Sequence, residues 1–363
     1  MLFGHGDDYY RSSAERLVNY SSNVWYGAEI EPLKEYMLAS VDRITRYPEP
    51  DAGSLRRMLA EVHQIDPSCL LVTNGSITAF YLIAQAYSQA RSMILVPSFA
   101  EYEDACRLYK HTLTFFSNQR NISELDLSQQ DFCWICNPNN PTGYLYTQKE
   151  MNQIRDLVKK YNLYLFSDEV YREFIYTGSP YISAMHLEGI EQNVILIDSF
   201  SKRYSECGIR IGTLMTKNEK VRAAVMKFCQ ARLSPPLIGQ IIAEASLDTP
   251  EEYLRSVYDE YVERRKCLID GLNRIPGVYT PIPMGAFYTV AKLPVDDTEK
   301  FAAWCLEEFS YEDATIMMAP ASGFYTTEKM GKDQVRLAYV LKKEDLQKAL
   351  IILEKALEKY NKR

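Results

Sequence analysis

The chain has 363 residues, 47% of them hydrophobic and 25% charged, which is ordinary for a globular protein of one large unit or two. A net charge of −7 and the lack of a basic run argue against a nucleic-acid partner, and no apolar run reaches the roughly 18 residues of a membrane span. The opening residues, MLFGHGDDYYRSS, lack the apolar segment of a signal peptide, and eight scattered cysteines suit a reducing, cytoplasmic location.

Helices and one buried strand are predicted in the first ninety residues. Residues 31–41 look helical, and from Gly53 onward apolar side chains recur at helical spacing at Leu55, Met58, Leu59 and Val62. A short strand at 69–73 ends at Asn74-Gly75-Ser76, and another helix follows. A strand, a Gly/Ser turn and a helix in succession point backbone N–H groups at an anion. A plain turn between strand and helix is the alternative reading of this segment.

The middle of the chain alternates between strands and helices. Strands are predicted at 93–96, 132–136, 163–167 and 194–197, and helices at 102–110 and 148–160. This alternation predicts a largely parallel sheet with helices on both faces. Asn140, Asp168 and Lys202 come just after strands, where ligands bind in open α/β sheets.

Metal and redox chemistry find little support in the sequence. Cys133 and Cys136 form a CxxC motif, but they lie in a predicted strand, where residues three apart point to opposite faces. The four histidines show no metal-ligand spacing. We therefore expect no metal site.

The segment Asp198–Gly212 is the strongest candidate for chemistry. Lys202 supplies a primary amine, which can form a Schiff base with an aldehyde once its pKa is lowered enough for it to lose its proton. A phosphate needs a guanidinium and short hydroxyl donors, which Arg210 and Ser199 provide. On its own, the segment also fits a surface lysine at the end of a strand.

The last third of the chain changes character after Pro235-Pro236. Residues 237–272 are predicted to be mostly helical with a break near Thr249-Pro250, and the second helix is long enough to bridge two domains. Strands are predicted near 286–293 and 334–340. The final segment places Leu346, Leu350, Leu353, Leu357 and Tyr360 on one helical face that would cover a sheet.

Four motifs in order resemble the fold-type-I pyridoxal-phosphate enzymes, and among them the aspartate-type class I and II aminotransferases. They are NPNNPTG at 137–143, SDEVY at 167–171, SFSK at 199–202 followed by Arg210, and VRLAY at 335–339. The resemblance implies an α/β fold with a mostly parallel central sheet flanked by helices and a smaller α+β domain. We expect a large cofactor-binding domain at 42–250 and a small domain formed by 1–41 and 251–363.

The resemblance implies that the cofactor is pyridoxal 5′-phosphate and gives each motif residue a role. Lys202 would hold the cofactor as a Schiff base and later shuttle a proton between the substrate Cα and the cofactor C4′. Asp168 would pair with the pyridine nitrogen and keep it protonated, so that the ring accepts electrons. Tyr171 and Asn140 would hydrogen-bond the phenolic oxygen of the ring.

The resemblance also implies which residues contact the cofactor's phosphate and the face of its pyridine ring. Ser199 and Arg210 would bind the phosphate, together with the backbone N–H groups of Ser76 and Ile77 at the start of a helix. Phe99 occupies the place of the aromatic residue that stacks on the ring, although a core position is the alternative.

Substrate binding and assembly are implied in the same way. Arg336 would hold the substrate α-carboxylate, with Asn140 beside it, and Gly27 would line the substrate site through its backbone. Tyr47, in RYPEP, resembles a tyrosine that reaches the phosphate of the neighbouring subunit's cofactor. The enzyme would then be a homodimer with shared active sites.

The expected reaction is transamination between an L-amino acid and a 2-oxo acid, with glutamate and 2-oxoglutarate as one pair. Histidinol-phosphate aminotransferases carry a second arginine shortly before the carboxylate-binding one, and no arginine lies between Arg274 and Arg336 here. Threonine-phosphate decarboxylases share features of the opening GHGDD and of PSFAEY, and in that alternative His5 would sit over the active site. A regulatory protein without turnover is a further reading, against which the acidic charge argues.

Overall fold

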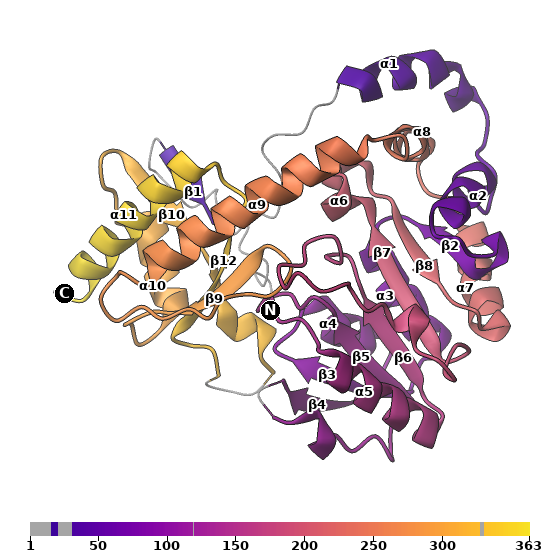
Figure 1. Cartoon of the computed structure of the whole chain (residues 1–363), viewed down its shortest axis with the longest axis horizontal. Coiled ribbons are helices and arrows are strands. Elements are labelled where there is room, and N and C mark those ends of the chain that lie inside the picture. The colour runs from indigo at the N-terminus through magenta and orange to yellow at the C-terminus, as the bar shows by residue number, and fades with distance from the viewer. Residues whose placement is uncertain (1–15, 21–30, 119, 327–329) are drawn as a thin grey trace.

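A seven-stranded sheet forms the larger part of the molecule in the computed structural model, which describes residues 16–20, 31–118, 120–326 and 330–363 (Figure 1). Its order is β2-β8-β7-β6-β5-β3-β4. The strands are β2 (Leu70–Thr73), β3 (Arg91–Val96), β4 (Thr112–Ser117), β5 (Phe132–Cys136), β6 (Tyr164–Asp168), β7 (Val194–Ser199) and β8 (Gly212–Met215). Every pair from β4 to β7 is parallel, whereas β8 runs antiparallel to both of its neighbours. The mostly parallel sheet predicted from the sequence is therefore confirmed.

Helices cover both faces of this sheet because its strands are apolar on both sides. The helices are α2 (Gly53–Val62), α3 (Ser76–Ala86), α4 (Glu101–Leu108), α5 (Gln148–Tyr161), α6 (Phe200–Arg203), α7 (Glu219–Ala231) and α8 (Leu237–Ser246). One buried cluster joins the sheet to α2 and α5, and a second joins it to α3, α4 and α7. Cys133 belongs to the first cluster and Cys136 to the second, so the two thiols point to opposite faces, as the CxxC argument predicted.

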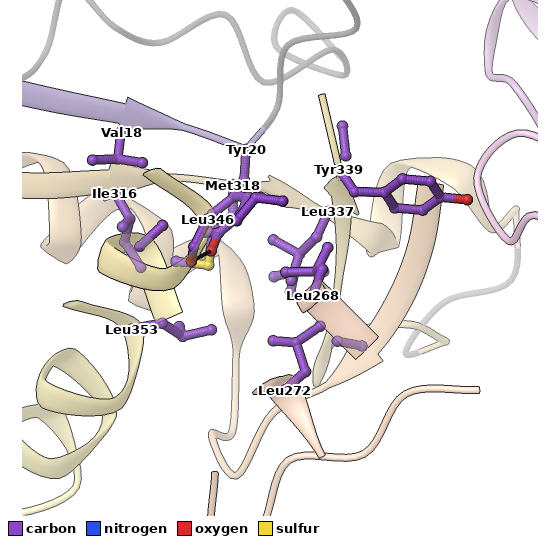
Figure 2. Close-up of a cluster of buried hydrophobic side chains, with 14 of the residues drawn as sticks. Val18, Tyr20, Leu268, Leu272, Ile316, Met318, Leu337, Tyr339, Leu346 and Leu353 are labelled. Atoms are coloured by element: carbon purple, nitrogen blue, oxygen red, sulfur yellow. Dashed lines mark hydrogen bonds between the residues drawn. The ribbon is translucent and has the colours of Figure 1, made fainter. Parts of the chain in front are cut away.

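A smaller region holds the remaining strands in two short sheets. One has the order β11-β12-β9 and the other pairs β1 with β10. Their bounds are β1 (Arg16–Asn19), β9 (Tyr288–Lys292), β10 (Ala314–Met317), β11 (Ala319–Pro320) and β12 (Gln334–Ala338), with α10 (Thr298–Glu307) and α11 (Lys343–Tyr360) beside them. Figure 2 shows how Val18 and Tyr20 join a core that α11 completes with Leu346 and Leu353. The Tyr20 hydroxyl donates to the Leu346 carbonyl at 3.3 Å.

The long helix α9 (Glu251–Leu272) connects the two regions and crosses the molecule diagonally in Figure 1. Its 22 residues span about 33 Å. The predicted break near Thr249-Pro250 lies between α8 and α9. Leu268 and Leu272 pack in the core of the smaller region, and buried Arg264 donates to the carbonyl of Val340.

Helix α1 (Glu31–Ser40) stands apart from both cores at one end of the molecule (Figure 1). It lies against α8, and none of its ten residues is buried. The short 3₁₀ helix that follows, Val41–Thr45, buries none either. Among the helices of the described ranges, none has the length and apolar character needed to cross a bilayer.

Candidate active site

A pocket of about 180 Å³ lies at the carboxyl ends of β5, β6 and β7. It gathers nine of the ten residues predicted to bind the cofactor: Ser76, Ile77, Phe99, Asn140, Asp168, Tyr171, Ser199, Lys202 and Arg210. Parallel strands bring these residues together because their carboxyl ends meet at one edge of the sheet. Residues far apart in the sequence therefore face one small volume.

One end of the pocket is built to bind an anion. Helix α3 begins there at Ser76 with Gly75 as N-cap, so no capping side chain hydrogen-bonds the first-turn N–H groups. Gly75 has φ +78°, and a Cβ at this position would lie 2.3 Å from Nη2 of Arg210. Arg210 itself has φ 59°, in the left-handed region. The helix N-terminus and the guanidinium thus converge on one point, an arrangement that suits a phosphate.

Close approach of two backbones tightens this end of the pocket. A Cβ at Gly212 would lie 2.4 Å from the backbone nitrogen of Ser76, so a glycine is required where β8 passes the start of α3. Ser199, which pairs with Gly212 across β7 and β8, caps α6, and its hydroxyl accepts from the backbone N–H of Ser201 at 3.1 Å.

The amine of Lys202 lies inside the pocket although its side chain keeps some exposure. Loss of hydration lowers its pKa to about 8, and the guanidinium groups of Arg336 and Arg210 act in the same direction. Its Nζ lies 6.0 Å from the ring centroid of Phe287. A substantial fraction of this amine is neutral at physiological pH, which a nucleophilic amine requires.

The carboxyl group of Asp168 ends β6 and is 3% exposed. Burial raises its pKa to about 7, and the negative charges of Asp198 and Glu169 add to this. Two donors oppose the shift: the Tyr102 hydroxyl at 2.5 Å and the backbone N–H of Val170 at 3.3 Å. Tyr102 was not identified from the sequence, where only its place three residues after Phe99 could have pointed to it.

Tyr171 and Asn140 line the pocket, whereas Arg336 on β12, 4% exposed, is not among the lining residues and connects to them through Asn140 and Tyr288. Nη1 of Arg336 donates to Oδ1 of Asn140 at 3.1 Å, which fixes the amide with its NH₂ group as the remaining donor. The hydroxyls of Tyr171 and Tyr288 are 3.0 Å apart. The Arg336 guanidinium carbon lies 4.7 Å from the ring centroid of Tyr288 and 5.0 Å from that of Phe324. Tyr288 and Phe324 were also missed, because nothing in the sequence places β9 or the 3₁₀ helix Ala321–Phe324 beside Arg336.

A charged network supports the pocket from behind. Arg172 pairs with Asp198 at 2.6 Å, and its guanidinium lies 3.5 Å from Nδ1 of His63 on the C-terminal side of α2. Arg203 pairs with Glu173 at 3.1 Å. These contacts hold the segment after β6, which includes Tyr171, against the strand that leads to Lys202.

Three predicted positions lie away from this pocket or beyond what is described. The side chain of Tyr47 is 86% exposed and lines a separate pocket of about 420 Å³ with Arg43 and Arg46. Gly27 and His5 lie outside the described residues.

The residues fit pyridoxal phosphate as a set. Gly75, Arg210 and the start of α3 leave room for a phosphate, Lys202 offers an amine for an aldehyde, and buried Asp168 can face a pyridine nitrogen. The three features of the pocket thus match three different groups of pyridoxal phosphate: its phosphate, its aldehyde and its ring nitrogen.

Comparison with known proteins agrees with this fit. The family described as "Aminotransferase class I and II" matches residues 15–353. Aspartate aminotransferase of Pyrococcus horikoshii is 26% identical over 349 residues, which are 90% of this chain and 87% of that protein. The crystal structure of L-threonine-O-3-phosphate decarboxylase from Porphyromonas gingivalis is 32% identical, with a TM-score of 0.78, and the match covers 95% of this chain and 100% of that one. Aspartate aminotransferase from Thermotoga maritima has a TM-score of 0.83 and 26% identity, with coverage of 95% and 92%.

Proposed function

The chain belongs to the class I and II aminotransferases, a family of pyridoxal-phosphate enzymes, and on this basis we propose that it moves an amino group between an L-amino acid and a 2-oxo acid. We propose glutamate and 2-oxoglutarate as one of the pairs. The observation that supports this most directly is the meeting of Lys202, Asp168 and the Gly75–Arg210 cradle in one pocket.

When bound, pyridoxal phosphate supplies an aldehyde that accepts the substrate's amino group and a ring that draws electrons away from the substrate's Cα. In this proposal, Nζ of Lys202 would hold the cofactor through its aldehyde, and the freed amine would carry the proton from the substrate Cα to the cofactor C4′. Its lowered pKa of about 8 suits both tasks, because a base works best when its pKa lies near the working pH. Asp168 holds a proton at the pyridine nitrogen.

The remaining residues orient the reactants. Arg336 binds the substrate α-carboxylate in a charge-assisted pair and so decides which bond at Cα stands perpendicular to the ring. Its contact with Asn140 at 3.1 Å ties carboxylate binding to the amide that we propose to face the phenolic oxygen of the ring. The proposed partner of Asn140 in that role is Tyr171, whose hydroxyl Tyr288 supports from behind.

The test of the reaction is a panel of L-amino acids incubated with 2-oxoglutarate and the purified holoenzyme. We expect glutamate to accumulate with at least one donor, and the Lys202→Ala variant to produce none. If no donor yields glutamate while a substrate releases carbon dioxide, the transamination proposal fails.

A second candidate is decarboxylation of O-phospho-L-threonine. It is favoured by the 32% identity to the Porphyromonas gingivalis decarboxylase, which exceeds the identity to the two aspartate aminotransferases above. Against it stands the absence of any arginine between Arg274 and Arg336 that could bind a substrate phosphate. O-phospho-L-threonine therefore joins the panel, and carbon dioxide with a phosphorylated amino alcohol as the products would select this candidate.

We also propose that the enzyme is a homodimer with shared active sites. An isolated helix of ten residues is unstable in water, and although α1 lies against α8, none of its residues is fully buried in its own chain, so we infer that a further surface covers it. Apolar side chains exposed nearby could meet that surface in a second copy: Leu38, Val41, Ile44, Tyr47 and Ile238.

All eight cysteines are free thiols, which supports the proposed cytoplasmic location.

A further inference from the structure

Tyr102 stands behind the carboxyl group that we propose for the pyridine nitrogen. It belongs to the first turn of α4, and its hydroxyl donates to Oδ2 of Asp168 at 2.5 Å. The residue is 1% exposed. Its ring packs edge-on against Phe80 at 5.0 Å and against Phe99 at 5.9 Å, and lies 6.1 Å from the ring of Trp134. These ring contacts hold the Tyr102 side chain in place, with its hydroxyl directed toward Asp168.

We propose that Tyr102 is a positioning residue that keeps the Asp168 carboxyl ionised and fixed in the direction of the cofactor's ring nitrogen. The proposal rests on the proposed function, because it assigns Tyr102 a role toward the group that Asp168 would serve. A hydrogen bond donated to a carboxylate favours its charged form. Within the described residues, the other donor to Asp168 is the N–H of Val170, at the longer distance of 3.3 Å.

The other groups around Asp168 do less than Tyr102 to favour its ionised form. Asp198 on β7 and Glu169 beside Asp168 are acidic and favour its neutral form. Cys136 on β5 is a buried thiol whose pKa is raised, so it brings no charge. Lys202 is the nearby cation, but its amine is the group that is to become attached to the cofactor. If the Lys202 amine is engaged by the cofactor, the phenol of Tyr102 and the N–H of Val170 remain as donors to the carboxylate among the described residues.

The geometry also links the face of the ring to its nitrogen. Phe99, proposed to stack on the ring, and Tyr102 lie three residues apart at the start of α4 and contact one another. A displacement of α4 would therefore move the stacking residue and the donor to Asp168 together. This predicts that deleting the hydroxyl alone, with the ring retained, affects protonation but not stacking.

The experiment uses the holoenzyme loaded with pyridoxal phosphate labelled with ¹⁵N in the ring, in wild type, Tyr102→Phe and the control Tyr81→Phe. Tyr81 also donates to a carboxylate, Glu101, at 2.6 Å, but lies outside the pocket. In Tyr102→Phe we expect the ¹⁵N resonance at neutral pH to move toward that of unprotonated pyridine. We also expect the acid limb of kcat to move up by about one to two pH units. Tyr81→Phe should match wild type in both readouts.

A second substitution tests the opposite direction and does not remove the hydrogen bond. Site-specific 3-fluorotyrosine at position 102 makes the phenol a stronger donor, so the acid limb should move to lower pH. An unchanged ¹⁵N resonance and acid limb in Tyr102→Phe overturns the inference; if that variant does not fold, an unchanged acid limb with 3-fluorotyrosine does so. A wild-type protein that binds no cofactor, or whose bound ring nitrogen is unprotonated, overturns the proposed function itself.

Discussion

At the scale of single residues, the chemistry depends on groups whose protonation is changed by burial. Lys202 has a pKa lowered to about 8 and Asp168 a pKa raised to about 7, in each case first through loss of hydration. Burial disfavours the charged form of both groups, so an amine and a carboxyl group move in opposite directions. Both pKa values lie near neutral pH, so each group can change its charge within the range in which we expect the enzyme to work.

Covalent capture of the cofactor should therefore depend on pH through Lys202. The neutral amine is the nucleophile, so the rate at which the apoprotein attaches pyridoxal phosphate should rise between pH 6 and 9 with a midpoint near 8. Stopped-flow absorbance measures this rate. Lys202→Arg keeps the charge but loses the amine and should give no attachment that borohydride can trap. A midpoint near 10.4, the ordinary value for lysine, would contradict the influence of burial.

Arg336 should act on substrate affinity. A charge-assisted hydrogen bond contributes about 1.5–3 kcal/mol, so Arg336→Ala should raise KM for the amino-acid donor by about ten- to hundredfold. Arg265 is the matched control, because its guanidinium also lies over an aromatic ring, that of Tyr176 at 4.7 Å, but donates to the carbonyl of Pro283 rather than to the pocket residue Asn140. Steady-state kinetics on both variants should separate them, and equal KM values would show that another group holds the carboxylate.

The residues found from the sequence and those missed differ in how they are encoded. Asp168 and Lys202 directly follow buried apolar runs, so their place at the ends of strands can be read from local pattern. Tyr102 and Tyr288 matter through contacts with residues 66 and 117 positions away. Such contacts depend on the order of strands in the sheet, which no local pattern specifies.

At the scale of elements, the N-terminus of α3 determines where we propose that the phosphate binds. Because Gly75 has no side chain, the Arg210 guanidinium can lie beside the first turn of α3. The turn Asn74-Gly75-Ser76 was predicted as an anion site, whereas β8, which presses Gly212 against Ser76, was not predicted. Its four residues, GTLM, are too short to stand out as a strand, and so are those of β10. Helix α7 was also missed.

Gly75→Ala should weaken cofactor binding out of proportion to its effect on stability. The added methyl group would meet Nη2 of Arg210 at 2.3 Å and displace the guanidinium. Gly178→Ala is the control, because Gly178 has a similar φ of +70° but no atom within 4 Å of the added carbon. Both variants should lose about 1 kcal/mol of stability from the strained φ. Only Gly75→Ala should raise the Kd for pyridoxal phosphate in equilibrium titration, and equal Kd values would contradict the cradle.

The contact of α2 with the network behind the pocket should be sensitive to acid. Burial lowers the pKa of His63 to about 4, and Arg172 beside it acts in the same direction. His63 stays neutral in the folded protein down to about pH 4, whereas in the unfolded chain it takes up a proton near pH 6.5. The free energy of unfolding should therefore fall as the pH is lowered from about 6.5 to 4. His63→Gln should remove at most about 3 kcal/mol of the stability difference between pH 7.5 and pH 4.5. Urea unfolding of both proteins at the two pH values measures it, and parallel losses would contradict the assignment.

At the scale of the whole molecule, the two regions and the projecting helix suggest how the protein assembles. We propose the domain boundaries at 42–250 and at 1–41 with 251–363, which separate the seven-stranded sheet from the short sheets around β9 and β10. Helix α1 stands apart from both cores (Figure 1), and none of its residues is fully buried in its own chain. Its sequence looks like an ordinary short helix, so the exposure on which we base the proposed dimer could not be read from the sequence.

Complementation between two damaged proteins tests the shared site directly. Lys202→Ala removes the attaching amine from its own site, and Tyr47→Ala removes the tyrosine that we propose to reach the partner subunit's cofactor. In a hybrid dimer, one site lacks both groups, whereas the other combines an intact Lys202 with an intact Tyr47. Random exchange makes half of the dimers hybrids, and each hybrid holds one complete site. Mixing and refolding equal amounts should thus restore about a quarter of the wild-type sites.

The readout should be specific to exchange between subunits. Tyr47→Ala alone should show a raised Kd for pyridoxal phosphate, and assays at a cofactor concentration below that Kd keep its own sites empty. Tyr144→Ala, another exposed tyrosine away from α1, replaces Tyr47→Ala in the control mixture and should show full activity before mixing. Activity that merely averages the two parent proteins, or a wild-type protein that is monomeric in light scattering, would mean that each chain builds its site alone.

A separate substitution tests the surface of α1. Leu38→Glu should make the otherwise dimeric protein monomeric, because a charge on an apolar contact surface opposes association.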